Sequence, residues 1–574
     1  MTPASSPLSR LLSQAWADLQ PFAGRFGLTW RVALLCAIVT AAAMMFKIPE
    51  ASISCYLIIF LMKEDAVQNC LMGFGLILLA TLVVVLMIPV INMSIDSPAM
   101  RLAIMFGVSY VFLFLSSTTP LGEQAAIVGL IVAFIMTLVT DVPIGQIGNQ
   151  GLLAAWKMAC MPMALMILFN LVLGIPAQTL VRNRIVRRLR ASADVLEHPD
   201  AGEELQELLA EGNDLSLQQM LTVKLLHLIS KEKSTWLNGA VETSYRVMLA
   251  SLAPAGSIAP ERARALAGEL RQAADEIASG NIPAAPAPEN ATDDSTAARK
   301  LSYALAALSK PDGGASPKPA PQRLLAADAF TNPDHQRYAL KTSLAAIICY
   351  LIYTGIQWDG IHTALITCYV AALGTTGETV RKLTLRIVGC LIGAAMGVGA
   401  LLFVMPHLTS IGGLMILVFA GTLVGAWVSS GNERISYSGV QIALAFLLTT
   451  LNGFGPSFEF SQAGDRIMGI FVGIFVIYVI FTQFWPKSVV NEVRDTLDRV
   501  SGDLKSLAGE TKDRRDSDLA ISMRAFGDLE HADEMLDMAY FEPRSERAPN
   551  EQLDGYRVTL EEMRSRLCGL QARA

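Results

Sequence analysis

Residues 51–67 read ASISCYLIIFLMKEDAV, and residues 364–380, 313 positions later, read ALITCYVAALGTTGETV. Identical residues occupy five aligned positions: Ala51/Ala364, Ile53/Ile366, Cys55/Cys368, Tyr56/Tyr369 and Val67/Val380. An acidic residue near the end of each copy is also kept, as Asp65 in the first copy and Glu378 in the second. This internal repeat predicts that the chain is built from two related halves.

The composition places the chain among integral membrane proteins. Hydrophobic residues make up 52% of its 574 positions and charged residues only 17%, and the mean hydropathy is +0.43. Soluble domains carry about 25% charged residues and lack repeated long apolar runs. The net charge of −6 says little about partners, because the charges are concentrated in separate polar regions.

Apolar segments fall into two groups. The first group covers residues 30–46, 51–62, 69–91, 101–117, 124–140 and 153–178. The second group covers residues 340–356, 361–373, 384–404, 411–428, 436–452 and 466–485. An even number of segments per group gives both halves the same orientation in the membrane, as in a parallel repeat. The sequence therefore predicts an all-α integral membrane protein with two parallel six-helix transmembrane repeats, about 12 segments in all, some short or re-entrant.

The second segment of each group is short. It has twelve residues in the first half and thirteen in the second, whereas a helix needs about 20 residues to span a bilayer. Short apolar segments at matching places in two repeats are typical of transport sites, although two ordinary tilted helices would give the same pattern. Each short segment runs into an acidic residue, Asp65 or Glu378, and this coincidence favours a functional site.

Polar regions divide the chain further. We expect a cytoplasmic N-terminal segment (1–29), a first transmembrane repeat (30–181), a cytoplasmic helical domain with Pro/Ala-rich linkers (182–336), a second transmembrane repeat (337–485) and a cytoplasmic helical C-terminal domain (486–574). The Arg-rich stretch RNRIVRRLR follows the first repeat directly, and basic loops are typical of the cytoplasmic side. Both termini are therefore expected in the cytoplasm.

A basic cluster opens the third segment of the second repeat, in GETVRKLTLRIVGCLIG (377–393). At 100° per residue, Lys382 and Arg386 share one face of a helix about one turn apart, while Arg381 points elsewhere. Two interpretations stay open at this point. The cations either anchor the helix at the cytoplasmic interface, or form a site in which Arg386 meets an anion or pairs with a carboxylate such as Glu378.

Three further features lie in or beside apolar segments. Asp465 and Arg466 open the last segment as neighbouring acid and base, which fits either a proton relay or gate, or a plain interfacial ion pair. Trp358 belongs either to the interfacial aromatic belt or to an aromatic binding site. Gly389 and Gly393 have the spacing that lets a second helix approach closely, within the chain or in a dimer.

Several function classes lack their motifs. The sequence contains no GxxxxGK followed by Ser or Thr, so a P-loop ATP-driven pump is excluded and an ion gradient must supply the energy of transport. It has no GxSxG, HExxH or Rossmann fingerprint in a suitable context, so an enzyme is not expected. The eight cysteines form no CxxC and no metal-ligand cluster, so no cofactor or metal is predicted. A basic face with interleaved aromatic residues, as nucleic-acid binding requires, is also missing.

A set of motifs follows the second half of the chain. They are Trp358, Gly377 and Arg381, then RIVGCLIG (386–393), SYSGVQIALAFLLTTLNGFGPS (436–457), DRIMGIFVGI (465–474) and AYFEPRSER (539–547). Together they resemble the fusaric acid resistance or aromatic acid exporter family. Cys390 departs from the family pattern, in which many members carry Thr, so the role of that position in this chain is open.

The resemblance implies a bacterial inner-membrane protein that exports aromatic carboxylic acids or similar toxic weak acids, driven by the proton-motive force. The residues of this chain are consistent with such a function. Our hypothesis is that Arg381 and Arg386 meet the charge of the organic-anion substrate and that Tyr56, Tyr369 and Trp358 stack on its ring. The residues that we assign to proton coupling, also as a hypothesis, are Asp65, Glu378, Asp465 and Arg466. The implied partners are the substrate, membrane lipid, a periplasmic adaptor, an outer-membrane channel and a second copy in a homodimer.

Two other functions remain open on the sequence. An anion channel with the same scaffold, as in the distantly similar plant malate channels, would need the cations only for selectivity. A membrane-anchored scaffold or sensor, built around the large cytoplasmic region, would not transport at all. The matched positions of Asp65 and Glu378 argue against the scaffold, and currents without proton coupling would identify the channel.

Overall fold

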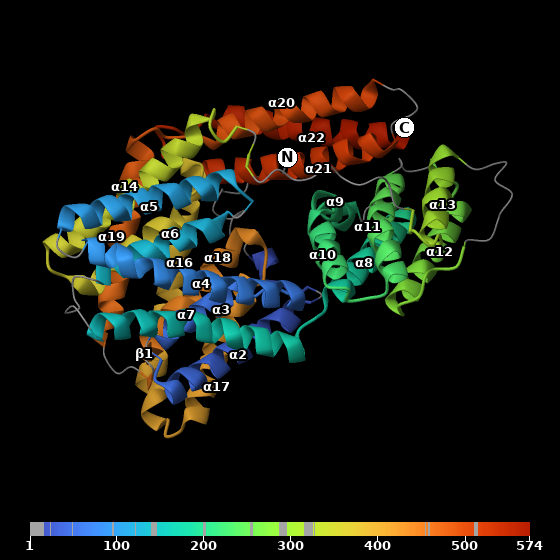
Figure 1. Cartoon of the computed structure of the whole chain (residues 1–574). Coiled ribbons are helices and arrows are strands. Elements are labelled where there is room, and N and C mark those ends of the chain that lie inside the picture. The colour runs from blue at the N-terminus through green and yellow to red at the C-terminus, as the bar shows by residue number, and fades with distance from the viewer. Residues whose placement is uncertain are drawn as a thin grey trace. The chain divides into compact units, whose positions relative to one another are not determined.

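The structure of the protein is a computed structural model (Figure 1). It describes every residue except 1–15, 23, 49, 95–96, 121, 139–145, 199–201, 253–256, 286–294, 315–324, 327, 454, 457–459, 510–514 and 574. The predicted N-terminal segment and Pro/Ala-rich linkers therefore lie partly outside the described residues. The described chain is helical apart from two strands of two residues each, which confirms the predicted all-α class.

Internal contacts divide the chain into two compact units. The apolar unit comprises Met1–Gly174 and Gln322–Lys487, and the polar unit comprises Ile175–Pro321 and Ser488–Ala574. Each unit is thus assembled from two stretches of chain that are distant in sequence.

Both halves of the chain contribute helices to the apolar unit. Those of the first half are α2 (Arg25–Phe46), α3 (Ala51–Leu61), α4 (Ala66–Ser94), α5 (Pro98–Thr118), α6 (Glu123–Leu138) and α7 (Gln146–Leu173). Those of the second half are α14 (Pro333–Gly355), α15 (Thr363–Ala371), α16 (Thr376–Phe403), α17 (Ile411–Ser429), α18 (Glu433–Thr450) and α19 (Phe460–Gln483). The short turns η2 (Asp359–Ile361) and η3 (Met405–His407) and the antiparallel strands β1 (Leu451–Asn452) and β2 (Gly455–Pro456) complete it.

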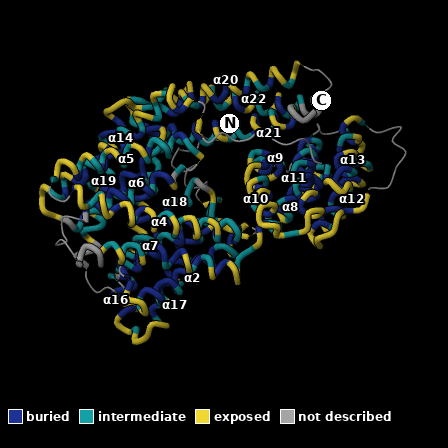
Figure 2. Tube along the Cα trace, in the orientation of Figure 1, coloured by how far each residue is buried: buried dark blue, intermediate teal, exposed yellow. Residues whose placement is uncertain are grey.

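Among the described residues, eight helices are long and apolar enough to cross a membrane. They are α2, α4, α5, α7, α14, α16, α17 and α19, the last of these and α7 over most of their length. Leu78, Leu82 and Leu86 are exposed at successive turns of α4, as expected of a surface that faces lipid. Figure 2 shows exposed stretches along α4. The predicted short segments are indeed short, since α3 has 11 residues and α15 has 9. At 1.5 Å per residue neither crosses a bilayer, so the predicted count of 12 spans is not reached by length and composition.

The helices of the two halves contact one another in a matching pattern. In the first half α3 packs on α7, and in the second half α15 packs on α19. Across the halves, α2 packs on α17 just as α14 packs on α5, and α3 packs on α18 just as α15 packs on α6. Each of these contacts thus has a counterpart made by the helices of the other half.

Cysteines repeat this correspondence at the residue scale. The thiol of Cys55 lies 3.4 Å from the carbonyl oxygen of Cys36, where α3 packs on α2. The sulfur atoms of Cys349 and Cys368 lie 3.5 Å apart, where α15 packs on α14. Both pairs are fully buried, and equivalent cysteines are 313 positions apart, which is the spacing of the sequence repeat. All eight cysteines are free thiols.

Glycines allow α16 and α18 to pack closely. A β-carbon added at Gly389 would meet the backbone oxygen of Ser438, and one added at Gly393 would meet that of Ile442. The sequence therefore predicts this contact correctly, and the partner helix belongs to the same chain. Close packing here fixes which residues of α18 face the basic start of α16.

Helices of the polar unit also come from both parts of the chain. From the middle of the chain come α8 (Ala177–Glu197), α9 (Gly202–Ala210), α10 (Asp214–Leu225), α11 (Lys231–Ser251), α12 (Pro260–Ala278) and α13 (Thr296–Leu308). From its end come α20 (Val489–Ala508), α21 (Arg515–Met538), the turn η4 (Ala539–Phe541) and α22 (Asn550–Arg573). A common core joins the two sets, in which Tyr245 and Leu205 lie with Val493 and Phe526. The helical character predicted for the polar regions is therefore confirmed.

Candidate functional site

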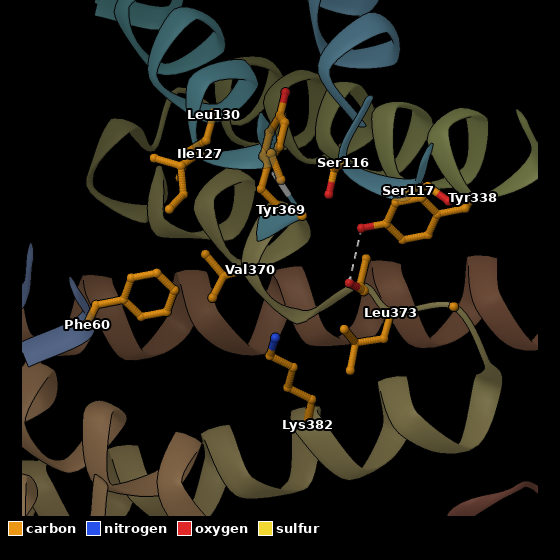
Figure 3. A pocket seen from close by; sticks show the side chains of 14 residues that line it. Phe60, Ser116, Ser117, Ile127, Leu130, Tyr338, Tyr369, Val370, Leu373 and Lys382 are labelled. Atoms are coloured by element: carbon orange, nitrogen blue, oxygen red, sulfur yellow. Dashed lines mark hydrogen bonds between the residues drawn. The ribbon is translucent and has the colours of Figure 1, made fainter. Parts of the chain in front are cut away.

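A cavity of about 250 Å³ lies inside the apolar unit. Helices α3, α5, α6, α14, α15 and α16 contribute to its walls. The side chains that give it its chemical character are Phe60, Ser116, Ser117, Tyr338, Tyr369 and Lys382 (Figure 3). The cavity is smaller than the roughly 300–1,000 Å³ of sites for drug-sized ligands, which favours a small molecule.

Aromatic rings form much of the wall. The ring of Phe60 stacks on that of Tyr56, one turn earlier on α3, with 5.9 Å between the ring centroids. Tyr369 is held by a hydrogen bond between its hydroxyl and that of Ser109 on α5, which leaves its ring against the cavity. The hydroxyl of Tyr338 donates to the backbone oxygen of Ala372 at 3.4 Å (Figure 3). Fixed rings of this kind suit a flat apolar ligand.

Two cations approach the same tyrosine of α18. The ammonium of Lys382, which lines the cavity, lies 5.0 Å from the ring centroid of Tyr437. The guanidinium of Arg386, one turn further along α16, donates from Nη1 to the Tyr437 hydroxyl at 2.9 Å. The helical spacing thus predicts the shared face correctly. Arg381 does not line the cavity, and its charge acts on the carboxyl of Asp18 instead.

Among the described residues, Arg386 is buried and has no carboxylate partner. Only 2% of the residue is exposed, and none of the ion pairs among the described side chains involves it. Its Nε has no hydrogen-bond acceptor, and neither has Nε2 of Gln441, which is fully buried one turn after Tyr437 on α18. Two buried donors without acceptors are costly, because each has lost its hydrogen bonds to water and gained none in the protein.

Tyr56 connects this charge to the cavity. Its phenolic group lies within electrostatic reach of the Arg386 guanidinium, and its ring stacks on Phe60 at the cavity wall. The contact joins a helix of the first half to one of the second half. Cys390 also lies beside Arg386, with its sulfur 3.9 Å from Oε1 of Gln441.

Asp65 and Glu378 act as caps on long helices. Oδ1 of Asp65 accepts hydrogen bonds from the backbone amides of Val67 at 2.8 Å and Gln68 at 3.3 Å, at the start of α4. Glu378 forms a capping box with Thr375 at the start of α16, and its Oε2 accepts from the Thr375 amide at 3.0 Å. Glu378 is therefore engaged with the helix terminus rather than with Arg386.

The turns that precede α4 and α16 also share a hydrogen bond from a backbone amide of the turn to a side chain of the long helix. Oδ1 of Asn69 accepts from the backbone amide of Lys63 at 2.8 Å, and Oγ1 of Thr379 accepts from that of Leu373 at 3.1 Å. These equivalent residues are 310 positions apart, whereas the paired cysteines are 313 apart. The second half therefore has three residues fewer than the first between the short helix and the turn. As a result, Asp65 in the first half corresponds to Thr375 in the second, and each caps the long helix that follows.

Trp358, Asp465 and Arg466 lie together, but away from the cavity lining. Oδ1 of Asp465 accepts from Nε1 of Trp358 at 3.1 Å. Arg466 pairs with Glu50, at 3.2 Å between Nη2 and Oε2, and also donates to the backbone oxygen of Leu448. Asp465 and Arg466 thus have different partners, and the pair Glu50–Arg466 joins the two halves of the chain.

The predicted site residues thus gather only in part. Tyr369 lines the cavity, Tyr56 and Arg386 adjoin it, and the other residues lie elsewhere. Sequence reasoning missed Phe60, Tyr437 and Gln441. Tyr437 and Gln441 lie one helical turn apart, and this spacing of polar side chains on one face of a membrane-embedded helix is the signal that points to them.

Comparisons with known proteins find one family whose model matches the second part of this chain. The Fusaric acid resistance protein family matches residues 335–574, a range that holds α14–α19 with the C-terminal helices. The predicted family resemblance is confirmed. No solved structure matches this chain.

Curated relatives extend the similarity to the first half. The chain is 28% identical over 519 residues to Multidrug resistance protein MdtO of Escherichia coli O6:H1, which covers 88% of this chain and 75% of that protein. It is 41% identical over 185 residues to MdtO of Shigella flexneri, covering 32% and 27%. It is 30% identical over 168 residues to Inner membrane protein YccS of Escherichia coli K12, covering 29% and 22%. These relatives are described as resistance or inner-membrane proteins.

Proposed function

We propose that this chain is an inner-membrane efflux protein that exports aromatic carboxylic acids or similar weak organic acids. The observation that carries the proposal is the aromatic cavity with Lys382 in its wall and the unpaired Arg386 one turn beyond. The MdtO relatives are named multidrug resistance proteins, which supports efflux in general. The substrate class rests on the chemistry of the cavity.

The cavity offers separate places for a ring and for a carboxylate. Phe60, Tyr338 and Tyr369 present fixed aromatic surface, on which a substrate ring gains area burial and ring–ring contact. The ammonium of Lys382 supplies the charge that a carboxylate needs. Burial strengthens such an ion pair compared with one in water, because the local dielectric constant is lower.

Arg386 provides a second place for the carboxylate along α16. Tyr437 contacts both cations, with its ring toward Lys382 and its hydroxyl toward Arg386, so it links the two positions. A substrate anion that leaves Lys382 would reach Arg386 and Gln441 about one helical turn further on. Arg381 and Trp358 would act at the two ends of this path, by attracting the anion and by contacting its ring.

Proton coupling is proposed for one of the predicted acidic residues. Asp65 and Glu378 both cap helices, and the amide analogue of each carboxylate keeps the capping hydrogen bonds. Asp465 is bound to Trp358, and Arg466 to Glu50 in the other half of the chain. Protonation of Asp465 or Glu50 would weaken contacts between segments at one end of the apolar unit. Glu378→Gln and Asp65→Asn therefore remove the titratable group and keep the cap, so they distinguish a role in proton coupling from a structural role.

Uptake of labelled hydroxybenzoate into inverted vesicles under an imposed pH gradient tests the function. We expect the native chain to accumulate the acid, and Lys382→Gln and Arg386→Gln to raise the half-saturating concentration about tenfold or more, because each removes a charged hydrogen bond. Arg381→Gln is the matched control, since it removes the same charge one residue from Lys382 but outside the cavity lining. Its effect should be smaller and should fade with salt.

The outcomes separate the parts of the proposal. Absence of accumulation by the native chain would overturn the aromatic-acid substrate. Unchanged kinetics in both Lys382→Gln and Arg386→Gln would overturn the anion site while leaving efflux intact. If uptake by Glu378→Gln no longer requires the pH gradient, proton coupling is assigned to that carboxylate. If uptake by this variant still depends fully on the gradient, Glu378 is not the coupling residue.

An anion channel is the second candidate, because a buried arginine without a carboxylate partner also suits a selectivity site. Currents that follow the anion gradient and ignore the pH gradient would identify it. A scaffold or sensor would show neither currents nor accumulation. The matching contacts of the two halves support a two-fold repeat with an axis along the membrane normal. The Arg-rich stretch 182–190 supports both termini in the cytoplasm. A periplasmic adaptor, an outer-membrane channel and a homodimer remain proposals from the family resemblance.

A further inference from the structure

The polar unit carries an exposed apolar patch at the end of α10. Leu221 and Leu225 are each 70% exposed, and Leu226 and Leu228 in the following turn are also exposed. The tube at α10 shows this exposure in Figure 2. Contiguous exposed leucines on an otherwise well-packed unit are costly in water and mark an interaction surface.

Positive charges border these leucines. Residues 221–233 read LTVKLLHLISKEK, with three lysines and a single acidic residue. Lys224 on α10 and Lys231 and Lys233 in the first turn of α11 are all exposed, as is His227 between them. Leucines rimmed by lysines form the pattern of a segment that lies in a membrane interface, with its apolar side chains toward the acyl chains and its cations toward headgroups.

The direction of α10 places the patch at one end of α8. Arg188 of α8 donates to Oδ1 of Asn213, and Arg184, one turn earlier, donates to Ser216 and Gln219. Decreasing numbers on α8 thus meet increasing numbers on α10, so the two helices are antiparallel. Continued at the same spacing, the end of α10 lies beside the first turn of α8.

The first turn of α8 is the part of the unit nearest in sequence to a membrane span. The span within α7 ends at Leu173, and α8 begins at Ala177, so only three residues separate them. A segment beside this turn is within reach of the bilayer surface whatever the rest of the polar unit does. The patch is thus at the end of the unit that a membrane is able to contact.

We propose that residues 221–233 dock on the surface of the bilayer, with Leu221 and Leu225 in the interface and the three lysines on anionic lipid headgroups. A second copy of the chain fits the patch poorly, because a two-fold contact would bring the lysine rims of both copies together. Docking would fix the polar unit against the membrane by a second point besides its covalent connections. The proposal is independent of any transported substrate.

Hydrogen exchange of the full chain in lipid nanodiscs tests the proposal. We expect amides of 221–233 to exchange more slowly in nanodiscs that contain phosphatidylglycerol than in nanodiscs of phosphatidylcholine alone. Each lysine near an anionic surface should contribute about fivefold to the docking equilibrium, so the triple variant Lys224→Gln, Lys231→Gln, Lys233→Gln should lose the difference. The double variant Leu221→Ser, Leu225→Ser should lose it as well.

Leu215→Ser is the matched control. Leu215 is exposed on the same helix but lies at its other end, toward Arg188, so this variant should keep the lipid-dependent protection. Unchanged protection of α11 beyond residue 233 would show that each variant is folded. Equal exchange in the two lipid compositions would overturn the proposal. Protection that depends on protein concentration and not on lipid would also overturn it, in favour of contact between copies.

Discussion

Arg25 and Arg386 are both buried arginines of the apolar unit, and their hydrogen-bond partners differ. Arg25 donates to the backbone oxygens of Asp18, Gln20 and Trp427 and lies 4.6 Å from the Trp427 ring. Arg386 has one hydrogen bond, to Tyr437, and its Nε has none. The first arginine is satisfied by the protein itself, whereas the second keeps a buried donor without an acceptor among the described residues.

This contrast predicts opposite effects of two equivalent substitutions. Arg386→Met should raise the free energy of unfolding by about 1–3 kcal/mol, because it removes an uncompensated buried charge, and it should abolish transport. Arg25→Met should lower the free energy of unfolding by about 2 kcal/mol or more, because three carbonyl groups lose their donor. Unfolding of both purified variants in one detergent measures this. Equal destabilisation of the two would mean that Arg386 is structural.

At the scale of elements, the contact between α16 and α18 depends on glycine. Gly393→Ala should lower the free energy of unfolding by about 1–3 kcal/mol, since the added methyl meets the Ile442 carbonyl and the Ala445 side chain. Gly399→Ala, on the same helix with open space around it, should instead raise it by about 0.5–1 kcal/mol. Thermal unfolding of the two variants compares them directly. A similar shift of the unfolding temperature in both variants would show that helix propensity, rather than packing against α18, determines the effect of the added methyl group.

The start of α20 has a carboxylate cap that makes its stability depend on pH. Glu542, which is 5% exposed, accepts from the Val489 amide at 2.6 Å and from the Ser488 hydroxyl at 3.2 Å. Burial raises the pKa of Glu542 above its ordinary value, and these hydrogen bonds offset only part of that effect. Since the folded pKa exceeds the unfolded one, the contribution of this group is complete at acid pH and is lost as pH rises through the folded pKa.

We therefore expect protection of the α20 amides, corrected for intrinsic exchange, to fall as pH rises from about 4.5 toward neutrality. Glu542→Gln should keep the cap geometry and remove this pH dependence. Hydrogen exchange of residues 489–497 at several pH values measures both. A pH dependence that survives in the variant would assign it to another group.

At the scale of the whole molecule, the sequence predicts features that depend on local patterns. It does not predict which residues of distant segments come into contact. The helical class, the shared face of Lys382 and Arg386 and the close approach at Gly393 follow from spacing along one helix, because they need only local geometry. Tyr437 and Tyr56 come to Arg386 from other helices, and no periodicity within one segment encodes that meeting. The sequence alignment also pairs Asp65 with Glu378, but the shorter α15 shifts the caps by three residues, so the two carboxylates hold different positions on their helices.

The crossed pairing of α2 with α17 also has a consequence for synthesis of the chain. Arg25 and the carbonyl of Trp427 that it binds are 402 residues apart. At about 5–20 residues per second, the ribosome makes α17 roughly 20 s to more than a minute after α2. During that delay the guanidinium of Arg25 lacks the acceptor that α17 brings and has only its local acceptors at Asp18 and Gln20. The pairing of α2 with α17 is therefore a late step in the biogenesis of this protein, because Trp427 exists only after most of the chain has been made.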